Sequence, residues 1–109
     1  MSIRIPTNSD RFYWTKHSLS KMQFYNLSES KIKSVLSRPD RTEDGIALKT
    51  MAVMQKTKSS KRPSEIWVMY QKIKLQIKVI SAWRYPGISP VGGKVPIPLE
   101  ILKDLGYKL

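Results

Sequence analysis

The stretch Lys74-Leu-Gln-Ile-Lys-Val-Ile-Ser-Ala-Trp-Arg-Tyr-Pro-Gly87 carries the clearest strand pattern in the sequence. Successive side chains of a strand point to opposite faces, so the stretch predicts two distinct faces. One face would hold Leu75, Ile77, Val79, Ser81 and Trp83, and the other Gln76, Lys78, Ile80, Ala82 and Arg84. Pro86 and Gly87 end regular pairing. We therefore expect Arg84 and Tyr85 where a core strand stops and a loop begins.

Two further strands are predicted upstream. Residues 46–55 predict a strand in which one face holds Ile46, Leu48, Thr50, Ala52 and Met54 and the other holds Lys49, Met51 and Val53. Residues 65–71 predict the next strand, with Ile66, Val68 and Tyr70 on the face opposite to Trp67 and Met69. Between them, residues 56–64 form a loop with the densest positive run in the chain. Residues 39–45 are rich in turn formers, and residues 72–74 are expected to form the tight turn into the final strand.

Two short helices are predicted before these strands. The first covers residues 14–25, with Thr15 as its N-cap, and the second begins after Ser28 and ends before Pro39. Local pairs support the second helix: Leu27 with Ile32 as a hydrophobic staple, and Glu29 with Lys33 as an ion pair. Their apolar stripes predict a helical hairpin packed on a sheet.

The C-terminal part begins with a segment rich in proline and glycine, residues 86–98. Pro98 suits a helix start, so a short helix is expected over residues 99–105, closed by Gly106. Near the N-terminus, the alternation around Ile3 and Ile5 is compatible with a short edge strand. The element order predicts a single α+β domain over residues 1–109, with a twisted antiparallel β-sheet.

The charge balance indicates the kind of partner. Twenty lysines and arginines against eight aspartates and glutamates give a net charge of +12 and a pI near 10.1. Solubility needs only roughly 2–8 charges in a small domain, so the excess points to nucleic acid. A generically basic protein is the alternative.

Composition also excludes several classes. The chain has no cysteine, which rules out disulfides, thiolate metal sites and cysteine nucleophiles. Nothing approaches the ~20 apolar residues of a membrane span, and the N-terminus lacks a secretory apolar segment. We expect a cytoplasmic protein with no membrane association.

One arrangement of motifs resembles a known group. His17-x-x-x-x-Met22 is followed by Leu27-Ser28 opening a helix, by Pro39-Asp40, and by a meander that ends in an aromatic-Arg strand. Over about residues 12–85 this resembles small, often phage-associated domains related to the RelE/ParE-like toxin superfamily. The resemblance implies a helical hairpin on a twisted antiparallel sheet. Members of the wider superfamily include ribosome-dependent messenger RNA nucleases and gyrase inhibitors, and an antitoxin protein is an implied partner.

Carried over by position, the family site falls on Arg84 and Tyr85. Lys49 and Lys78 on the sheet and Arg62 in the loop are approximate further matches. The chain departs from the pattern after its last strand, where many superfamily toxins end and this chain continues into the segment 86–98. That segment could cover the surface that the site would use.

Metal-independent RNA cleavage suggests roles for these residues. It needs proton transfer and stabilisation of charge on the phosphate. His17, the single histidine, has the pKa that suits proton transfer, and Lys21, four residues on, would lower it. Arg84 could hold two phosphate oxygens, and Tyr85 could donate a proton or stack on a base. The expected nucleic-acid-binding residues are Lys21, Lys49, Lys56, Lys58, Lys61, Arg62 and Lys78.

Each of these residues also has a structural interpretation. His17 could cap or pack its helix, and Arg84 could pair with Glu43, Asp44 or Glu65 across the sheet. Trp83 and Tyr85 could be core aromatics, and the basic loop could be a solvated turn.

Other chemistries find little support. The sequence Val91-Gly92-Gly93-Lys94 lacks the spacing of a phosphate-binding loop. Asp40, Glu43 and Asp44 suit a turn better than a magnesium site. We expect no metal and no cofactor. The sequence thus predicts a toxin-like protein that binds RNA or the ribosome. Metal-independent endoribonuclease activity is the catalytic hypothesis that accompanies this prediction. A non-catalytic partner-binding module, of gyrase-inhibitor or mobile-element accessory type, is the alternative.

Overall fold

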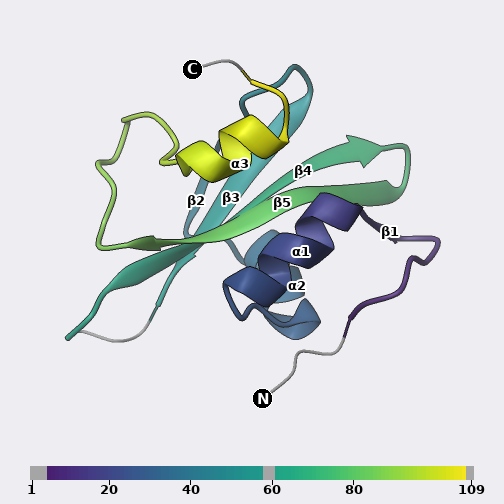
Figure 1. Cartoon of the computed structure of the whole chain (residues 1–109), viewed down its shortest axis with the longest axis horizontal. Helices are drawn as coiled ribbons and strands as arrows, with labels where there is room; N and C mark the ends of the chain where they lie inside the picture. Colours follow the sequence, from purple (N-terminus) through teal and green to yellow (C-terminus); the bar gives the residue numbers. More distant parts are fainter. Residues whose placement is uncertain (1–4, 58–60, 108–109) are drawn as a thin grey trace.

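The computed structural model describes residues 5–57 and 61–107. Its elements are β1 (Phe12–Trp14), α1 (Lys16–Phe24), α2 (Glu29–Ser37), β2 (Arg41–Asp44), β3 (Thr50–Lys56), β4 (Ser64–Ile73), β5 (Gln76–Pro86) and α3 (Leu99–Asp104). The strands form a five-stranded sheet in the order β1-β5-β4-β3-β2 (Figure 1). The predicted α+β class is confirmed.

The sheet is mixed, so the prediction of an antiparallel sheet was wrong for one strand. β1 pairs in parallel with β5, with Phe12 opposite Ile77 and Trp14 opposite Val79, while the other pairs are antiparallel. A parallel pair requires a long connection, and here the chain between β1 and β5 contains α1, α2 and three strands.

The short edge strand expected around Ile3 and Ile5 falls partly outside the described residues, which exclude residues 1–4. Ile5 itself is not in a strand.

The predicted N-caps Thr15 and Ser28 are confirmed, but Trp14, which was expected in the first helix, belongs to β1. The Thr15 side chain accepts a hydrogen bond from the Ser18 N–H, and the Ser28 side chain accepts one from the Lys31 N–H. These bonds satisfy N–H groups that have no partner within the first turn of a helix. The predicted ion pair in α2 also forms, with 2.7 Å between the Lys33 Nζ and a Glu29 carboxylate oxygen.

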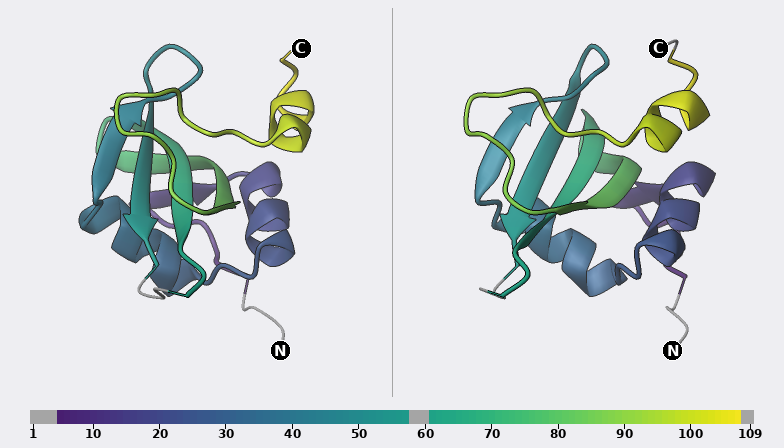
Figure 2. Two further views of the ribbon diagram at one scale, coloured as in Figure 1. Left: turned by 90° about the vertical axis from the view of Figure 1, so that its left-hand side faces the viewer. Right: turned by 60° about the vertical axis from the view of Figure 1, so that its left-hand side comes forward.

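Each face of the sheet carries its own hydrophobic core. On one face α1 and α2 pack against the strands, and on the other the C-terminal part crosses it (Figure 2). We call these the first and second cores. The first core comprises Trp14, Met22, Leu27, Ile32, Val35, Val53, Ile66, Val68, Val79 and Ala82. The second comprises Ala52, Met54, Trp67, Met69, Trp83 and Ile101, with Val95 and Ile97 packed against it.

A bulge in β5 overturns the predicted faces of that strand. Met69 of β4 lies opposite Ser81, but the next residue, Tyr70, lies opposite Val79, so Ile80 has no partner on β4. One extra residue in a strand reverses the alternation beyond it. Val79 and Ala82 therefore belong to the first core together, whereas Trp83 belongs to the second.

Two expected boundaries also change. Residues 41–44 of the predicted turn region form the edge strand β2. Arg84 and Tyr85 lie at the end of β5, as expected, and pair with Ile66 and Glu65 of β4. Pro86 is the last residue of β5, so the strand pairing continues further than the proline and glycine suggested.

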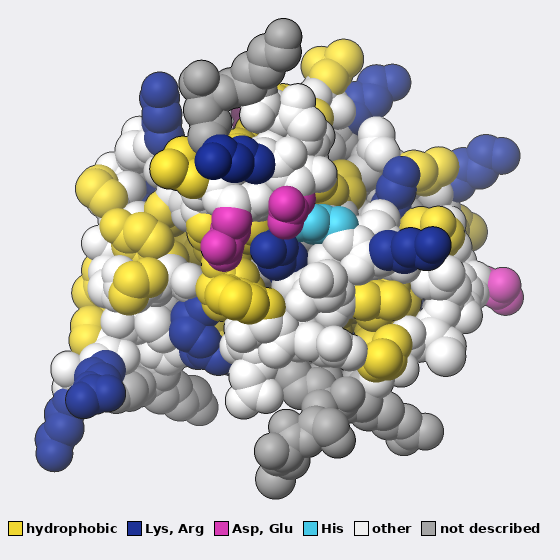
Figure 3. Space-filling model, in the orientation of Figure 1, with side chains coloured by type: hydrophobic (Ala, Val, Ile, Leu, Met, Phe, Trp, Pro, Cys, Tyr) yellow, Lys and Arg dark blue, Asp and Glu magenta, His cyan; other side chains and the backbone are white. Residues whose placement is uncertain are grey.

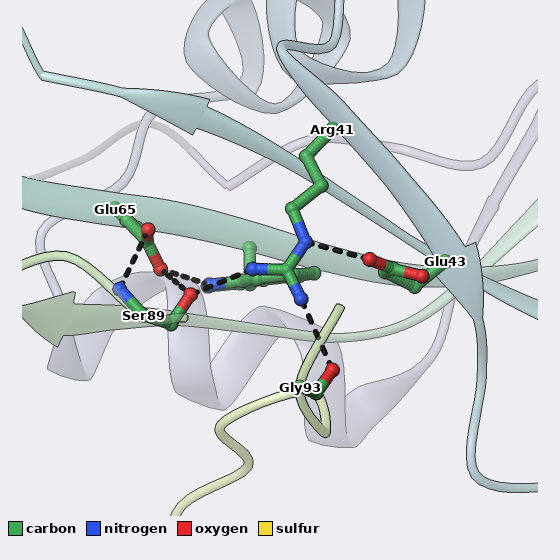
Figure 4. Close-up of polar contacts among 6 residues, drawn as sticks. Arg41, Glu43, Glu65, Ser89 and Gly93 are labelled. Atoms are coloured by element: carbon green, nitrogen blue, oxygen red, sulfur yellow. Dashed lines mark hydrogen bonds and ion pairs between the residues drawn. The ribbon is translucent and has the colours of Figure 1, made fainter. Parts of the chain in front are cut away.

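The segment that follows, residues 87–98, is fastened to the sheet through buried polar groups (Figure 4). Glu65 is 1% exposed, and its carboxylate accepts hydrogen bonds from the Ser89 N–H at 3.0 Å and the Ser89 hydroxyl at 2.7 Å. Arg41 donates to the Ser89 hydroxyl and to the Gly93 carbonyl. The segment therefore closes the second core.

Within the described residues, no helix has the length and apolar character needed to cross a membrane.

Candidate nucleic-acid interface

His17 lies where α1 meets β5 and α3. Its Nε2 lies 2.8 Å from the Ser81 hydroxyl oxygen, and its Nδ1 lies 3.9 Å from a carboxylate oxygen of Asp104. The same oxygen lies 3.2 Å from the Lys21 Nζ. Figure 3 shows the histidine beside basic and acidic side chains near α3. The fold thus joins His17 and Lys21, as expected, and adds Ser81 and Asp104.

Burial and the neighbouring charges set the protonation of His17. Its pKa lies below the usual value of 6.5, chiefly because burial disfavours the charged ring and secondly because Lys21 repels it. Asp104 acts in the opposite direction. Lys21 lowers the pKa of His17, as expected, but burial lowers that pKa more. The ring is therefore neutral at pH 7 and can take part in proton transfer.

The Ser81, His17 and Asp104 set superficially resembles the triad of serine hydrolases. However, Ser81 is fully buried, and a nucleophile must reach its substrate. The 3.9 Å separation of His17 and Asp104 is also too long for a hydrogen bond. We interpret this cluster first as the contact that fixes α1 to β5 and α3.

Arg84 and Tyr85 lie apart from His17. One Arg84 nitrogen donates to the Tyr25 carbonyl at the end of α1 over 3.4 Å, and Tyr85 packs against the second core. Arg84 follows Ser81 by three residues, which places them about 10 Å apart along β5 and on opposite faces. His17 contacts Ser81, so the fold does not bring His17 and Arg84 together at one point.

Two of the three carboxylates that were expected as partners of Arg84, Glu43 and Glu65, form other contacts, and no ion pair joins Arg84 to Asp44. Glu43 pairs with Arg41 over 2.6 Å, and Glu65 accepts hydrogen bonds from Trp67 and Ser89.

Tyr25, whose carbonyl accepts the bond from Arg84, also links α1 to α3 through its side chain. The Tyr25 hydroxyl donates to Glu100 over 2.6 Å. Burial and this bond raise the pKa of Tyr25 above its usual range.

Apart from Lys21, which lies in α1 and pairs with Asp104, the predicted binding residues that the structure describes separate into two groups at opposite ends of the sheet. Lys49 precedes β3, and Lys78 of β5 lies opposite Gln71 near the same end. Lys56 ends β3, seven residues after Lys49, which corresponds to roughly 20 Å along the strand. Lys61 and Arg62 are exposed just before β4, and Lys58 lies outside the described residues.

The end that carries Lys56 also gathers cations from α2 that sequence reasoning missed. Lys31 and Arg38 are seven positions apart, a spacing that places them on one side of a helix and could have been noticed. They line a cavity of about 370 Å³ between α2 and the end of β3. Its lining residues are Lys31, Ser34, Arg38, Asp40, Gln55 and Lys56.

Gln55 organises this cavity. Its side-chain N–H groups donate to the carbonyl oxygens of Ser34 and Arg38, both at 3.0 Å, and its side-chain oxygen lies 2.9 Å from the Lys31 Nζ. Opposite, Asp40 accepts a hydrogen bond from the Lys56 backbone N–H at 2.8 Å. The cavity walls are therefore held by direct hydrogen bonds between α2 and β3.

A second cavity, of about 580 Å³, has a different character. It lies between the turn after β2, the segment 87–98 and α3, and its charged residues are Glu43, Asp44 and Lys94. Ile46, Val95, Ile97 and Leu102 provide apolar lining. With two carboxylates and one lysine, this cavity suits an anion less well than the cavity beside α2.

No protein-family model, curated protein or solved structure gives a significant match to the chain.

Proposed function

We propose that this protein binds RNA through the end of the molecule where α2, β3 and β4 meet. We call this surface the basic end and define it by Lys31, Arg38, Lys56, Lys61 and Arg62. The observation that carries the proposal concerns four of these residues, all except Arg62. In the part of the chain that the structure describes, Lys31, Arg38, Lys56 and Lys61 form no ion pair.

The few carboxylates are largely committed to contacts within the fold. Six of the eight accept hydrogen bonds or form ion pairs: Glu29, Asp40, Glu43, Glu65, Glu100 and Asp104. Of these, Asp40 lies at the basic end, where it accepts the Lys56 N–H. The positive charges of Lys31, Arg38, Lys56 and Lys61 are consequently left available to an external anion.

A phosphate backbone suits such a surface. Lysine and arginine side chains that neutralise phosphates release counterions, which makes binding strong at low salt and weak at high salt. Ribosomal RNA and messenger RNA both present this chemistry, so a ribosome is an eligible target. Because phosphate contacts do not read bases, the basic end predicts affinity more directly than sequence specificity.

A salt titration of RNA affinity tests the proposal. Fluorescence anisotropy with a labelled RNA should show tight binding at low ionic strength and a linear loss of log K with log salt. The double variant Lys56→Gln and Lys61→Gln should reduce the salt slope by about two, roughly one for each lost phosphate contact. Lys72→Gln with Lys74→Gln, at the β4–β5 turn, removes the same charge elsewhere and is the matched control.

Two results would contradict this function. Salt-insensitive binding, or no binding at low ionic strength, would remove RNA as the partner. An equal reduction of the salt slope in both double variants would show that the net charge alone drives binding. The basic end would then contribute no more than other lysines of the surface.

A ribonuclease activity of the RelE-like type is a second proposal. The observation that favours it is the position of His17, whose Nε2 lies 2.8 Å from the Ser81 hydroxyl oxygen and whose Nδ1 lies 3.9 Å from an Asp104 carboxylate oxygen. Burial lowers the pKa of His17, which favours the neutral ring. A neutral imidazole beside a carboxylate can accept the proton of a 2′-hydroxyl. On this proposal an antitoxin protein would be a natural partner. If no cleavage occurs, a binding protein without catalysis is the function that remains.

A further inference from the structure

The cavity beside α2 has the size, charge and polar lining of a specific anion site. It measures about 370 Å³, which exceeds the needs of a water molecule and can admit a phosphate with part of its sugar. Lys31, Arg38 and Lys56 contribute three positive charges, and Asp40 contributes one negative charge. The net charge of the lining is therefore +2.

The position at the end of a helix at first argues against an anion. The last carbonyls of a helix carry partial negative charge, which repels phosphate. Here the Gln55 amide donates to the Ser34 carbonyl, the Ser34 hydroxyl and the Arg38 carbonyl, at 3.0, 3.1 and 3.0 Å. The repulsive carbonyls thus already have a donor, and their effect on the cavity is reduced.

Gln55 also directs a cation toward the cavity. The Lys31 Nζ donates one hydrogen bond to the Gln55 side-chain oxygen over 2.9 Å. An ammonium group has three donors, so two remain for a ligand. Among residues 5–57 and 61–107, the Arg38 guanidinium makes one hydrogen bond, a long contact of 3.4 Å to the Ser34 hydroxyl, and most of its donors remain for a ligand.

The charge of the lining favours one kind of phosphate. An internal phosphodiester carries a single negative charge and continues as a chain on both sides. A terminal phosphate monoester carries about −1.5 to −2 at pH 7 and has three acceptor oxygens. A recess with a net charge of +2 matches the monoester better. The negative charge of Asp40 weakens the attraction of the cavity for a phosphate. The Asp40 carboxylate is held beside the end of β3, because it accepts a hydrogen bond from the Lys56 N–H.

We propose that this cavity binds a terminal phosphate monoester of RNA, with Lys31, Arg38 and Lys56 as its ligands and Gln55 as the positioning residue. The inference rests on the proposed RNA binding, which it narrows to RNA ends. A 5′-phosphate and a 3′-phosphate share this chemistry, and the experiment separates them.

The test compares three RNAs of one sequence that carry a 5′-phosphate, a 3′-phosphate or hydroxyls at both ends. One charge-assisted contact corresponds to about tenfold in affinity or more, so one phosphorylated RNA should bind at least tenfold more tightly than the hydroxyl RNA. Arg38→Gln should reduce this ratio to below about threefold. Lys61→Gln, in the basic end but outside the cavity, should weaken all three RNAs alike and preserve the ratio.

Equal affinity for the three RNAs, or an unchanged ratio in Arg38→Gln, would overturn the inference while leaving RNA binding intact. Inorganic phosphate provides an independent measurement, because it should shift the side-chain amide resonances of Gln55 in the wild type and not in Arg38→Gln. If RNA fails to bind but phosphate shifts Gln55, the proposed function fails and the anion site stands. No shift together with no terminal preference would remove the site.

Discussion

The indole rings of Trp67 and Trp83 stack in the second core, with ring centroids 6.2 Å apart and planes inclined by 8°. Both side chains are fully buried. Their N–H groups differ, because the Trp67 Nε1 donates to the Glu65 carboxylate over 3.0 Å, whereas the Trp83 Nε1 has no hydrogen-bond partner in the described structure. Two similar residues on neighbouring strands therefore contribute to stability differently.

The matched substitutions Trp67→Phe and Trp83→Phe should separate these contributions. Both remove similar buried apolar area, but only Trp67→Phe leaves the buried Glu65 carboxylate short of a donor. Losing a bond to a buried charged group costs roughly 1–3 kcal/mol, so Trp67→Phe should be the more destabilising by about that amount. Urea denaturation measures both free energies of unfolding. Equal losses would mean that the Glu65 contact contributes nothing.

Gly45 should tolerate no side chain. A Cβ atom there would lie 2.7 Å from the Thr50 Cβ and 2.9 Å from the Thr50 carbonyl carbon, and Thr50 is buried. Overpacking of this kind costs typically 1–3 kcal/mol, so Gly45→Ala should lower the free energy of unfolding by about that much. Gly93→Ala is the control, because its nearest contact would be 3.3 Å. A smaller loss at Gly45 than at Gly93 would contradict the packing of this turn.

Stability should fall on mild acidification because of His17. Its folded pKa lies below 6.5, so the unfolded state binds the proton more readily. The stabilisation is therefore complete above about pH 6.5 and is lost as the pH falls toward the folded pKa.

His17→Gln is the variant that isolates this effect, because glutamine can still bond the Ser81 hydroxyl but does not titrate. Between pH 7.5 and pH 5.5 the wild type should lose more unfolding free energy than the variant. Parallel losses in the two proteins would show that other groups cause the pH dependence.

Cleavage of RNA in the presence of EDTA should distinguish the two proposed functions. If His17 is the general base, His17→Gln should abolish cleavage while salt-dependent binding persists, since His17 is not part of the basic end. Arg84 lies on the opposite face of β5 from Ser81, so the fold predicts that Arg84→Ala affects cleavage less than His17→Gln does. Expression in bacteria provides a second readout: an active nuclease should arrest growth, and the His17 variant should relieve the arrest.

A greater effect of Arg84→Ala than of His17→Gln would instead favour the site implied by the toxin resemblance. Undiminished growth arrest in both variants would exclude both residues from the mechanism.

Local sequence was most informative where a few neighbouring residues decide the structure. The caps Thr15 and Ser28 and the ion pair of Glu29 with Lys33 all form as predicted, because each depends on residues within one turn of a helix. Alternation in β3 and β4 was also correct, with Val53 and Val68 in the first core and Met54 and Trp67 in the second. In these strands the period of two is uninterrupted.

The candidate site could be predicted only in part. The pairing of His17 with Lys21 follows from helical spacing, but Asp104 is more than eighty residues away in sequence and reaches them only because α3 packs beside α1. Likewise, Lys56 was singled out from a basic run, whereas Lys31, Arg38 and Gln55 were not. Their convergence depends on how α2 lies against the end of β3.

The sequence by itself determined the helix starts, the α+β class and the large positive charge, since these follow from local spacing and composition. Only the tertiary structure decided which face Trp83 occupies and that Lys31, Arg38 and Lys56 line one cavity. The bulge at Ile80 arises from pairing with β4 and reverses every side chain beyond it, a long-range effect that alternation within β5 does not reveal. The cavity beside α2 exists because Gln55 joins two elements that are distant in sequence.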